Sequence, residues 1–250
     1  MPNPKKAQRT KGNVKPSSSS QAAQLLVASG QAPTGFIGFT NQPAFVPASE
    51  TFDDAESAID DDFRFVLRKL SKRDSVTKVK ALQEFITLCS SKDEEIIKVM
   101  IPFWPRVYTK VTIDVDHKVR ELSQKALATL AARTGKALAP YLKSIMGSWM
   151  VSMCDTYPTV ASAANTAFAN TFSLAKQTEA IQFCKTEIAE CLLNYILQQN
   201  ARTLSDPLTT NDEDMESKYQ RVVSSSLHAF SKLLYMLPAD SVSSSMLTYV

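Results

Sequence analysis

Glycine and histidine are both scarce in this sequence, which has six glycines and two histidines among its 250 residues. Turn-rich β structure and the glycine-rich loops that bind nucleotide phosphates both require glycine, so the composition argues against either one. His117 and His228 have no carboxylate or nucleophile partner at the spacing of a known catalytic motif. The sequence therefore predicts long helices and no active site of its own.

The four cysteines and two histidines also cannot form a RING module, which binds two four-coordinate zinc ions. Cys184 and Cys191 share one helical face, but two helical turns separate them by roughly 10 Å, which is too far for one zinc ion. Both of them, like Cys89 and Cys154, stand in apolar helical patterns typical of buried thiols in a reducing compartment. We expect no metal or other cofactor in this chain, and a cytosolic location.

Long apolar runs are absent as well. No segment approaches the roughly 20 apolar residues of a membrane-spanning helix, and residues 1–15 are basic without the apolar stretch of a signal peptide. The net charge of +3 is too small to mark the whole chain as a nucleic-acid-binding protein. We expect a monomer without a membrane segment, whose electrostatic contacts depend on local clusters of charge.

Residues 1–52 are rich in Ser, Pro, Gln, Thr and Lys and show little helical periodicity, so we predict a mostly disordered arm. Its basic residues could neutralise the phosphates of an RNA or could simply keep a tail solvated, and charge alone does not separate the two. Within the arm, the apolar segment Gly35–Phe39 (GFIGF) is expected to dock on the chain's own fold. The basic residues of the arm are Lys5, Lys6, Arg9, Lys11 and Lys15.

An abrupt change of charge follows the arm. Acidic residues crowd positions 50–62, and a basic cluster begins directly after them. Phe63, Val66 and Leu70 recur at three- and four-residue steps, which predicts a helix with one buried face and basic residues around the other. Acids before a helix and bases at its end also suit the helix dipole, so the charges have a purely structural interpretation too. The basic cluster comprises Arg64, Arg68, Lys69, Lys72 and Arg73.

Helical periodicity continues to the end of the chain, with capping residues and prolines between the segments. The predicted helices are one that starts at Asp60 to Asp62 and runs toward Leu70, one capped by Ser75, one around 94–100, Asp116 to Gly135, one opened by Pro140, one from Pro158 to Phe172, the four-turn apolar stripe from Ile181 to Tyr195, and one from about 212 to 237. In the last of these we expect burial of Val222, Val223, Leu227, Phe230 and Leu234.

Helices of this length, in pairs about 40 residues apart, are typical of HEAT or armadillo solenoids. We predict an all-α, HEAT/armadillo-like helical solenoid over residues 53–250, with a compact helical bundle as the alternative. The bulky pair Phe103 and Trp104, which stands between Pro102 and Pro105, is expected to pack inside an interhelix corner. Residues 245–250 resemble an apolar helix in progress, so we expect that the chain continues in a longer protein.

Several long strings of this sequence resemble the amino-terminal region of listerin-type E3 ubiquitin ligases, and they occur in the same order. The resemblance covers residues 9–188 and is weaker beyond them. The strings are RTKGNVKPSSS from Arg9, GFIGF from Gly35, DDFRFVLRKLSKRDSVTKVKALQEF from Asp61, PFWPRVYTKVTIDVDHKVRE from Pro102, LAPYLKSIMGSWMVSMCDTYPTVASAA from Leu138 and EAIQFCKTEI from Glu179.

The resemblance implies a HEAT-type solenoid that docks on the large ribosomal subunit, near the sarcin-ricin loop and a NEMF-type nascent-chain-sensing factor. In such ligases a distant carboxy-terminal RING, which binds zinc and the ubiquitin-conjugating enzyme, ubiquitinates stalled nascent chains in ribosome-associated quality control. Because the RING is missing from this chain, we expect no ligase activity from the chain alone.

Two functions therefore remain open. In the first, the arm and the basic cluster bind ribosomal RNA or a ribosome-bound factor, and affinity falls steeply with salt. In the second, the chain is a generic HEAT-repeat protein-interaction scaffold or adaptor without RNA contact, and its charges serve only solubility. An enzyme with its own active site is the least favoured alternative, and it would require a deep pocket lined by titratable groups with shifted pKa values.

Overall fold

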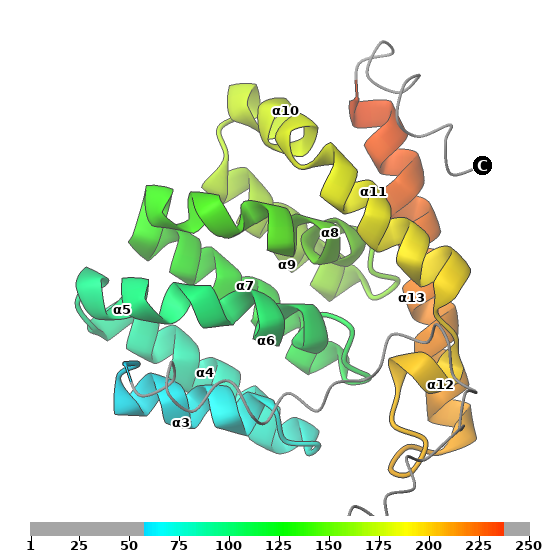
Figure 1. Cartoon of the computed structure of the whole chain (residues 1–250), viewed down its shortest axis with the longest axis horizontal. Helices are drawn as coiled ribbons and strands as arrows, with labels where there is room; N and C mark the ends of the chain where they lie inside the picture. Colours follow the sequence, from blue (N-terminus) through cyan, green and yellow to red (C-terminus); the bar gives the residue numbers. More distant parts are fainter. Residues whose placement is uncertain (1–57, 238–250) are drawn as a thin grey trace, which may run out of the picture. The chain divides into compact units, whose positions relative to one another are not determined.

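The computed structural model describes residues 58–237, and every regular element of this region is a helix (Figure 1). The expected all-α fold is therefore confirmed for the described part of the chain. The predicted arm of residues 1–52 and the apolar residues 245–250 lie outside it. The elements are α3 (Asp61–Leu70), α4 (Ser75–Ser91), α5 (Glu94–Met100), η1 (Ile101–Phe103), α6 (Trp104–Val111), α7 (His117–Thr134), η2 (Gly135–Tyr141), α8 (Leu142–Met153), α9 (Pro158–Thr171), α10 (Leu174–Phe183), α11 (Lys185–Leu193), η3 (Asn194–Gln198), α12 (Ala201–Leu204) and α13 (Asp212–Met236).

The helices pack in successive layers, as expected of a HEAT-like solenoid (Figure 1). Helix α3 packs on α4, α7 packs on both α4 and α9, and α8 packs on α9 and α11. The layers repeat in the sequence, because the buried Val119 and Ala126 of α7 are matched 41 residues later by the buried Val160 and Ala167 of α9. Apart from the one-turn α12, every α-helix of the described region contributes buried apolar side chains to one continuous core.

Helices α3 and α7 begin where the sequence predicts. The Asp60 carboxylate accepts a hydrogen bond from the amide of Asp62 and caps α3, whose apolar face is buried as expected. Asp116 caps α7 in the same way, and Gly135 ends this helix with φ 49°, a backbone conformation that suits glycine.

Three other helix limits differ from the prediction. Pro140 does not open α8 but lies within the 3-10 helix η2, and α8 begins at Leu142. Asp74, not Ser75, caps α4, because the Asp74 carboxylate stands one residue earlier and accepts the amide of Thr77 at 2.7 Å. The stripe from Ile181 to Tyr195 is not one helix, since the backbone leaves α-helical geometry at Cys184 (φ −102°, ψ 10°), between α10 and α11. The break is short, and most of the stripe stays buried.

A chain of aromatic side chains joins the first two layers. The Phe63 ring meets Phe85 edge-on, Phe85 stacks on Trp104 with centroids 4.4 Å apart, and Trp104 lies next to Tyr108. Trp104 is fully buried, which confirms that the aromatic corner packs inward. The corner is nevertheless helical: Pro105 stands in the first turn of α6, where its missing amide costs no hydrogen bond, and the sequence analysis missed this helix.

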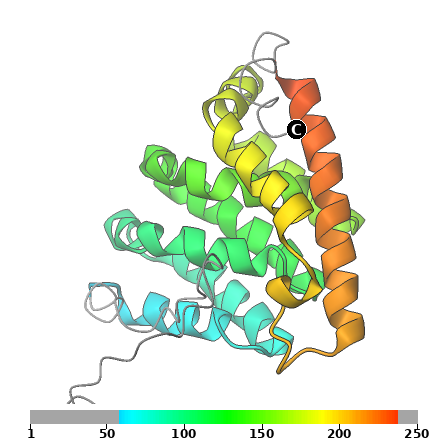
Figure 2. The ribbon, with the colours of Figure 1, turned by 45° about the vertical axis from the view of Figure 1, so that its right-hand side comes forward.

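Helix α13 does not add another layer to the stack. After α11 the chain returns past α12, and the 25-residue α13 then runs along the stack, across the ends of the earlier helices (Figure 2). Arg221 donates to the carbonyls of Ile113 and Asp114 between α6 and α7, and Lys232 donates to Asn165 of α9. One helix therefore contacts several layers at once.

The buried face of α13 matches the prediction only in part. Val222 is fully buried and Phe230 packs against the core, as expected, and Val223 is half-buried. Leu227 and Leu234 are 53% and 37% exposed, whereas Leu233 is fully buried. Ser225 and Ala229 also face the core. The prediction assumed that the largest apolar side chains point inward, but small side chains allow α13 to lie close against the helix ends that it crosses.

A buried ionic network lies where α13 crosses the turns of the stack. Arg120 of α7 donates through Nε and Nη2 to both carboxylate oxygens of Asp155, at 2.8 and 3.2 Å. Its Nη1 donates to the carbonyls of Asp114 and Val115. Arg221 approaches the same Asp155 carboxylate at 3.6 Å. Arg120 and Asp155 thus offset each other's desolvation, which a lone buried charge could not do.

Replacing Arg120 with alanine should lower the free energy of unfolding by roughly 3–5 kcal/mol, because the Asp155 carboxylate would stay buried with too few partners. Urea denaturation followed by circular dichroism measures the change. Lys118→Ala is the matched control, since Lys118 is 48% exposed and pairs with Glu121 at the surface, where an ion pair contributes less than about 1 kcal/mol. Equal losses in the two variants would contradict the role given to the network.

Gly147 of α8 lies so close to α11 that a Cβ at position 147 would stand 2.5 Å from the Cβ of Cys191. Gly147→Ala should therefore destabilise the fold by about 1–3 kcal/mol, the usual cost of overpacking, although alanine favours helices. Ser144→Ala on the exposed side of α8 is the control. A Gly147→Ala variant as stable as the parent chain in the same urea titration would contradict this packing.

Candidate functional site

The basic cluster predicted from the sequence lies on the exposed side of α3 and in the turn that follows it. The apolar face of α3 is buried, which leaves the basic side chains at the surface. Residues 61–73 carry five basic and two acidic side chains, so this surface has an excess of positive charge. Arg64 and Lys69 are partly exposed, and Arg68, Lys72 and Arg73 are exposed.

Two members of the cluster form ion pairs at the surface. Arg64 pairs with Asp61 one turn earlier on α3. The Lys69 ammonium lies 2.7 Å from the Glu84 carboxylate of α4. Exposed pairs of this kind contribute about 0–1 kcal/mol each. The ion pairs therefore orient the Arg64 and Lys69 side chains, and a phosphate that displaced the carboxylates would lose little of this energy.

The acidic side chains at the start of α3 have a structural role. Asp60 and Asp62 both bind the Lys92 ammonium, at 3.0 and 2.7 Å. These hydrogen bonds raise the pKa of Lys92 above its ordinary value. Acids in the first turn of α3 and bases in its last turn also match the helix dipole. The structural interpretation thus accounts for the acids, and the basic residues remain in excess.

An exposed aromatic ring lies within the basic cluster, and the sequence analysis missed it. Phe65 of α3 is 61% exposed, and the Lys69 ammonium lies 4.2 Å from the centroid of its ring. The helical period gave a signal, because position 65 falls outside the buried stripe of Phe63, Val66 and Leu70. Such a ring adds a flat apolar surface to an otherwise charged one.

The basic residues of the arm, like the GFIGF segment, lie outside the described residues. The structure therefore brings together only one half of the predicted basic set, the half on α3. The arm residues in question are Lys5, Lys6, Arg9, Lys11 and Lys15.

The turn after α3 meets the segment that leads into α13, and a groove of about 600 Å³ lies there. Arg73 donates to the carbonyl of Thr209, and Lys78 binds Asp114 at 2.5 Å. Burial lowers the pKa of Lys218 to about 8. Side chains of both signs line this groove, so it has no strong preference for an anion or a cation.

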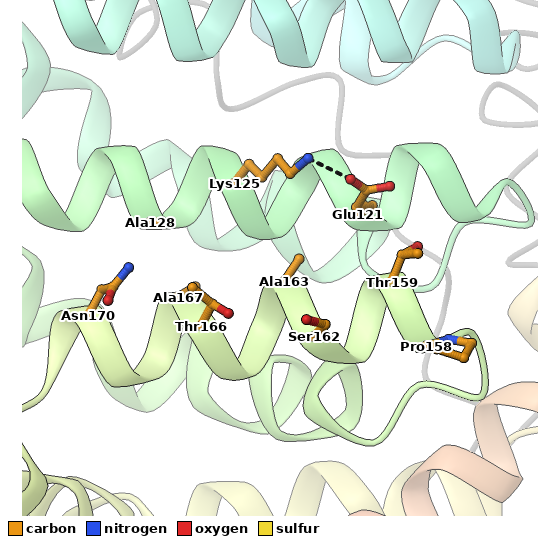
Figure 3. Close-up of a pocket in the computed structure, with 10 residues that line it drawn as sticks. All are labelled: Glu121, Lys125, Ala128, Pro158, Thr159, Ser162, Ala163, Thr166, Ala167 and Asn170. Atoms are coloured by element: carbon orange, nitrogen blue, oxygen red, sulfur yellow. Dashed lines mark hydrogen bonds and ion pairs between the residues drawn. The ribbon is translucent and has the colours of Figure 1, made fainter.

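A second groove, of about 570 Å³, lies between α7 and α9 (Figure 3). Small side chains such as Ala128, Ser162 and Ala163 line much of it. Lys125 binds Glu121 at 2.5 Å, and this hydrogen bond lowers the pKa of Glu121.

The two histidines are placed as packing and surface residues. His117 stacks on Tyr157 with ring centroids 4.1 Å apart, and His228 is exposed. Between residues 58 and 237, no three His, Cys, Asp or Glu side chains are grouped so that they could hold a metal ion. The same region has no helix of the length and apolarity that a membrane crossing requires.

Comparison with known proteins decides the family. The family model described as "E3 ubiquitin-protein ligase listerin, N-terminal domain" matches residues 57–250. The chain belongs to the listerin family. Listerin of Gallus gallus is 49% identical over 237 residues, which are 94% of this chain and 13% of that protein. Listerin of Drosophila melanogaster is 40% identical over 239 residues, and that of Schizosaccharomyces pombe 28% over 187 residues.

This chain spans only a small part of its listerin relatives. The aligned residues cover 14% of the Drosophila protein and 11% of the Schizosaccharomyces pombe protein, but 91% and 74% of this chain. The basic surface of α3 and the layered fold thus lie within the listerin amino-terminal domain.

The thiols of this domain should be unreactive while it is folded. Burial raises the pKa of Cys89 to about 12 and the pKa values of Cys184 and Cys191 to about 11, and it also raises the pKa of Cys154. A neutral thiol is a poor nucleophile, so we expect slow reaction with an aromatic disulfide reagent at mildly alkaline pH. All four thiols should react rapidly in urea. Rapid reaction of several thiols in the folded chain would contradict this assignment.

Proposed function

We propose that this chain is the ribosome-docking region of a listerin-type RING E3 ubiquitin ligase that acts in ribosome-associated quality control in the cytosol. It binds the large ribosomal subunit, through ribosomal RNA and proteins, together with a NEMF-type nascent-chain-sensing factor. A distant carboxy-terminal RING of the parent ligase then ubiquitinates stalled nascent chains. The observation that carries the proposal is the listerin match over residues 57–250, combined with the basic surface that α3 presents within it.

The charge of α3 supports an RNA partner. Five basic side chains against two acidic ones give residues 61–73 a net charge of +3, which equals the net charge of the whole 250-residue chain. Ribosomal RNA presents a dense array of phosphates, and cations that neutralise them release counterions into solution. The two surface ion pairs of the cluster are weak enough for a phosphate to replace the carboxylate.

The chemistry of ubiquitin transfer belongs elsewhere in the parent protein under this proposal. A RING holds two zinc ions through cysteine and histidine ligands, and this chain has four cysteines and two histidines in all. The ubiquitin-conjugating enzyme therefore binds through the carboxy-terminal region, and the region described here positions the ligase on the ribosome.

A HEAT-type scaffold that binds only proteins is the competing function. The groove between α7 and α9, which has small side chains and one ion pair, is the surface such a partner would use (Figure 3). Salt separates the two functions, since contacts to phosphates weaken steeply with ionic strength and apolar protein contacts do not.

Charge reversal at all five basic positions of α3 should abolish co-sedimentation of the chain with purified large ribosomal subunits in moderate salt. The double variant Arg68→Glu and Lys72→Glu should lose part of the affinity. The slope of log affinity against log salt should become shallower by about one for each phosphate that the variant no longer binds. Sedimentation across a salt series measures both quantities.

Lys136→Glu combined with Lys176→Glu is the control for the double variant, because it changes the net charge equally at exposed positions outside α3. Circular dichroism checks that each variant is folded, which matters most for Arg73, whose guanidinium contacts the Thr209 carbonyl. Unchanged binding of the five-fold variant would remove the α3 surface from the proposed function. Binding that does not respond to salt would favour the protein scaffold.

A further inference from the structure

Phe65 occupies an unusual position for a large apolar side chain. It is the one exposed large hydrophobic residue within α3, and 61% of its surface is accessible. The Lys69 ammonium lies 4.2 Å from the ring centroid, so a cation covers one part of the ring. The same ammonium binds Glu84 of α4, which fixes its place beside the ring. The remaining ring surface is open to a ligand.

The surroundings of Phe65 on the helix are charged, not apolar. The side chains three and four residues away are Asp61, Asp62, Arg68 and Lys69. Asp61 pairs with Arg64, and Asp62 pairs with Lys92, so both acids are neutralised within the chain.

These surroundings favour a nucleic acid over a protein partner. Apolar protein contacts need a contiguous patch with a dry centre, and α3 offers a single ring. A flat aromatic surface with cations beside it is instead the arrangement that receives an unpaired nucleobase, with the flanking phosphates bound by the cations.

We infer that Phe65 stacks on an unpaired base of RNA while the basic residues around it bind the neighbouring phosphates. This rests on the proposed function, and it specifies the ligand as a looped or single-stranded segment, because bases in a continuous duplex are not available for stacking. The α3 surface therefore recognises RNA by its unpaired bases as well as by its charge.

A tryptophan at this position reports on stacking directly. The two native tryptophans, Trp104 and Trp149, are fully buried, so in the Phe65→Trp variant the new indole is the exposed one. Its fluorescence should be quenched when a short single-stranded oligoadenylate is added to the full chain. An abasic ribose-phosphate strand of equal length, or heparin, should bind through charge and leave the emission unquenched.

Substitutions then test the energetic role of the ring. Phe65→Ala should weaken oligoadenylate binding roughly tenfold, as expected for loss of one stacked base. Phe65→Leu should be equally weak, and Phe65→Trp should bind as tightly as the parent chain. Recovery of oligoadenylate binding by leucine would overturn the inference, because an apolar side chain without a ring would then suffice. Equal quenching by oligoadenylate and by the abasic strand would overturn it as well.

Different results would contradict the stacking role of Phe65 and the proposed function. If charge reversal on α3 weakens sedimentation with large subunits while Phe65→Ala has no effect on it or on oligoadenylate binding, the ribosome-docking function stands and the stacking role is wrong. If neither the parent chain nor any variant binds subunits or RNA, both are wrong.

Discussion

The described fold depends on a pair of buried carboxylates at the turns of the stack. Asp114 and Asp155 are 6% and 8% exposed, and burial at that level is costly unless basic partners are close. Lys78 binds the Asp114 carboxylate at 2.5 Å, and Arg120 binds both carboxylate oxygens of Asp155. A third nitrogen of Arg120 donates to the backbone carbonyl of Asp114, just before α7. Arg221 brings α13 to the same place. Helix α13 therefore crosses the layers at the point where Arg221 can contact both the Asp114 backbone and the Asp155 carboxylate.

Part of the fold could be predicted from the sequence. The α3 stripe of Phe63, Val66 and Leu70 was predicted because each helix of a stack buries one face against a neighbouring helix, and periodicity reports that face. The same reasoning failed for Leu227 and Leu234, since α13 packs across helix ends and its contacts follow the shape of the turns. The Arg120–Asp155 pair was also missed, because 35 residues separate its members and no local pattern joins them.

The sequence also predicted only part of the candidate site. The basic residues of α3 stood out as a run of one charge. Phe65 was overlooked because an aromatic ring was assumed to belong to the core, although its position outside the buried stripe of Phe63, Val66 and Leu70 follows from the helical period. The structure separates it from them and places it beside Lys69.

Membership of the listerin family and the charge of α3 together support the proposal that this region anchors a ubiquitin ligase to the ribosome through α3. Electron cryo-microscopy of the chain bound to purified large subunits tests this claim most directly. We expect density in which α3 and the turn after it face ribosomal RNA. A complex in which α3 faces solvent and the groove between α7 and α9 makes the contact would contradict it.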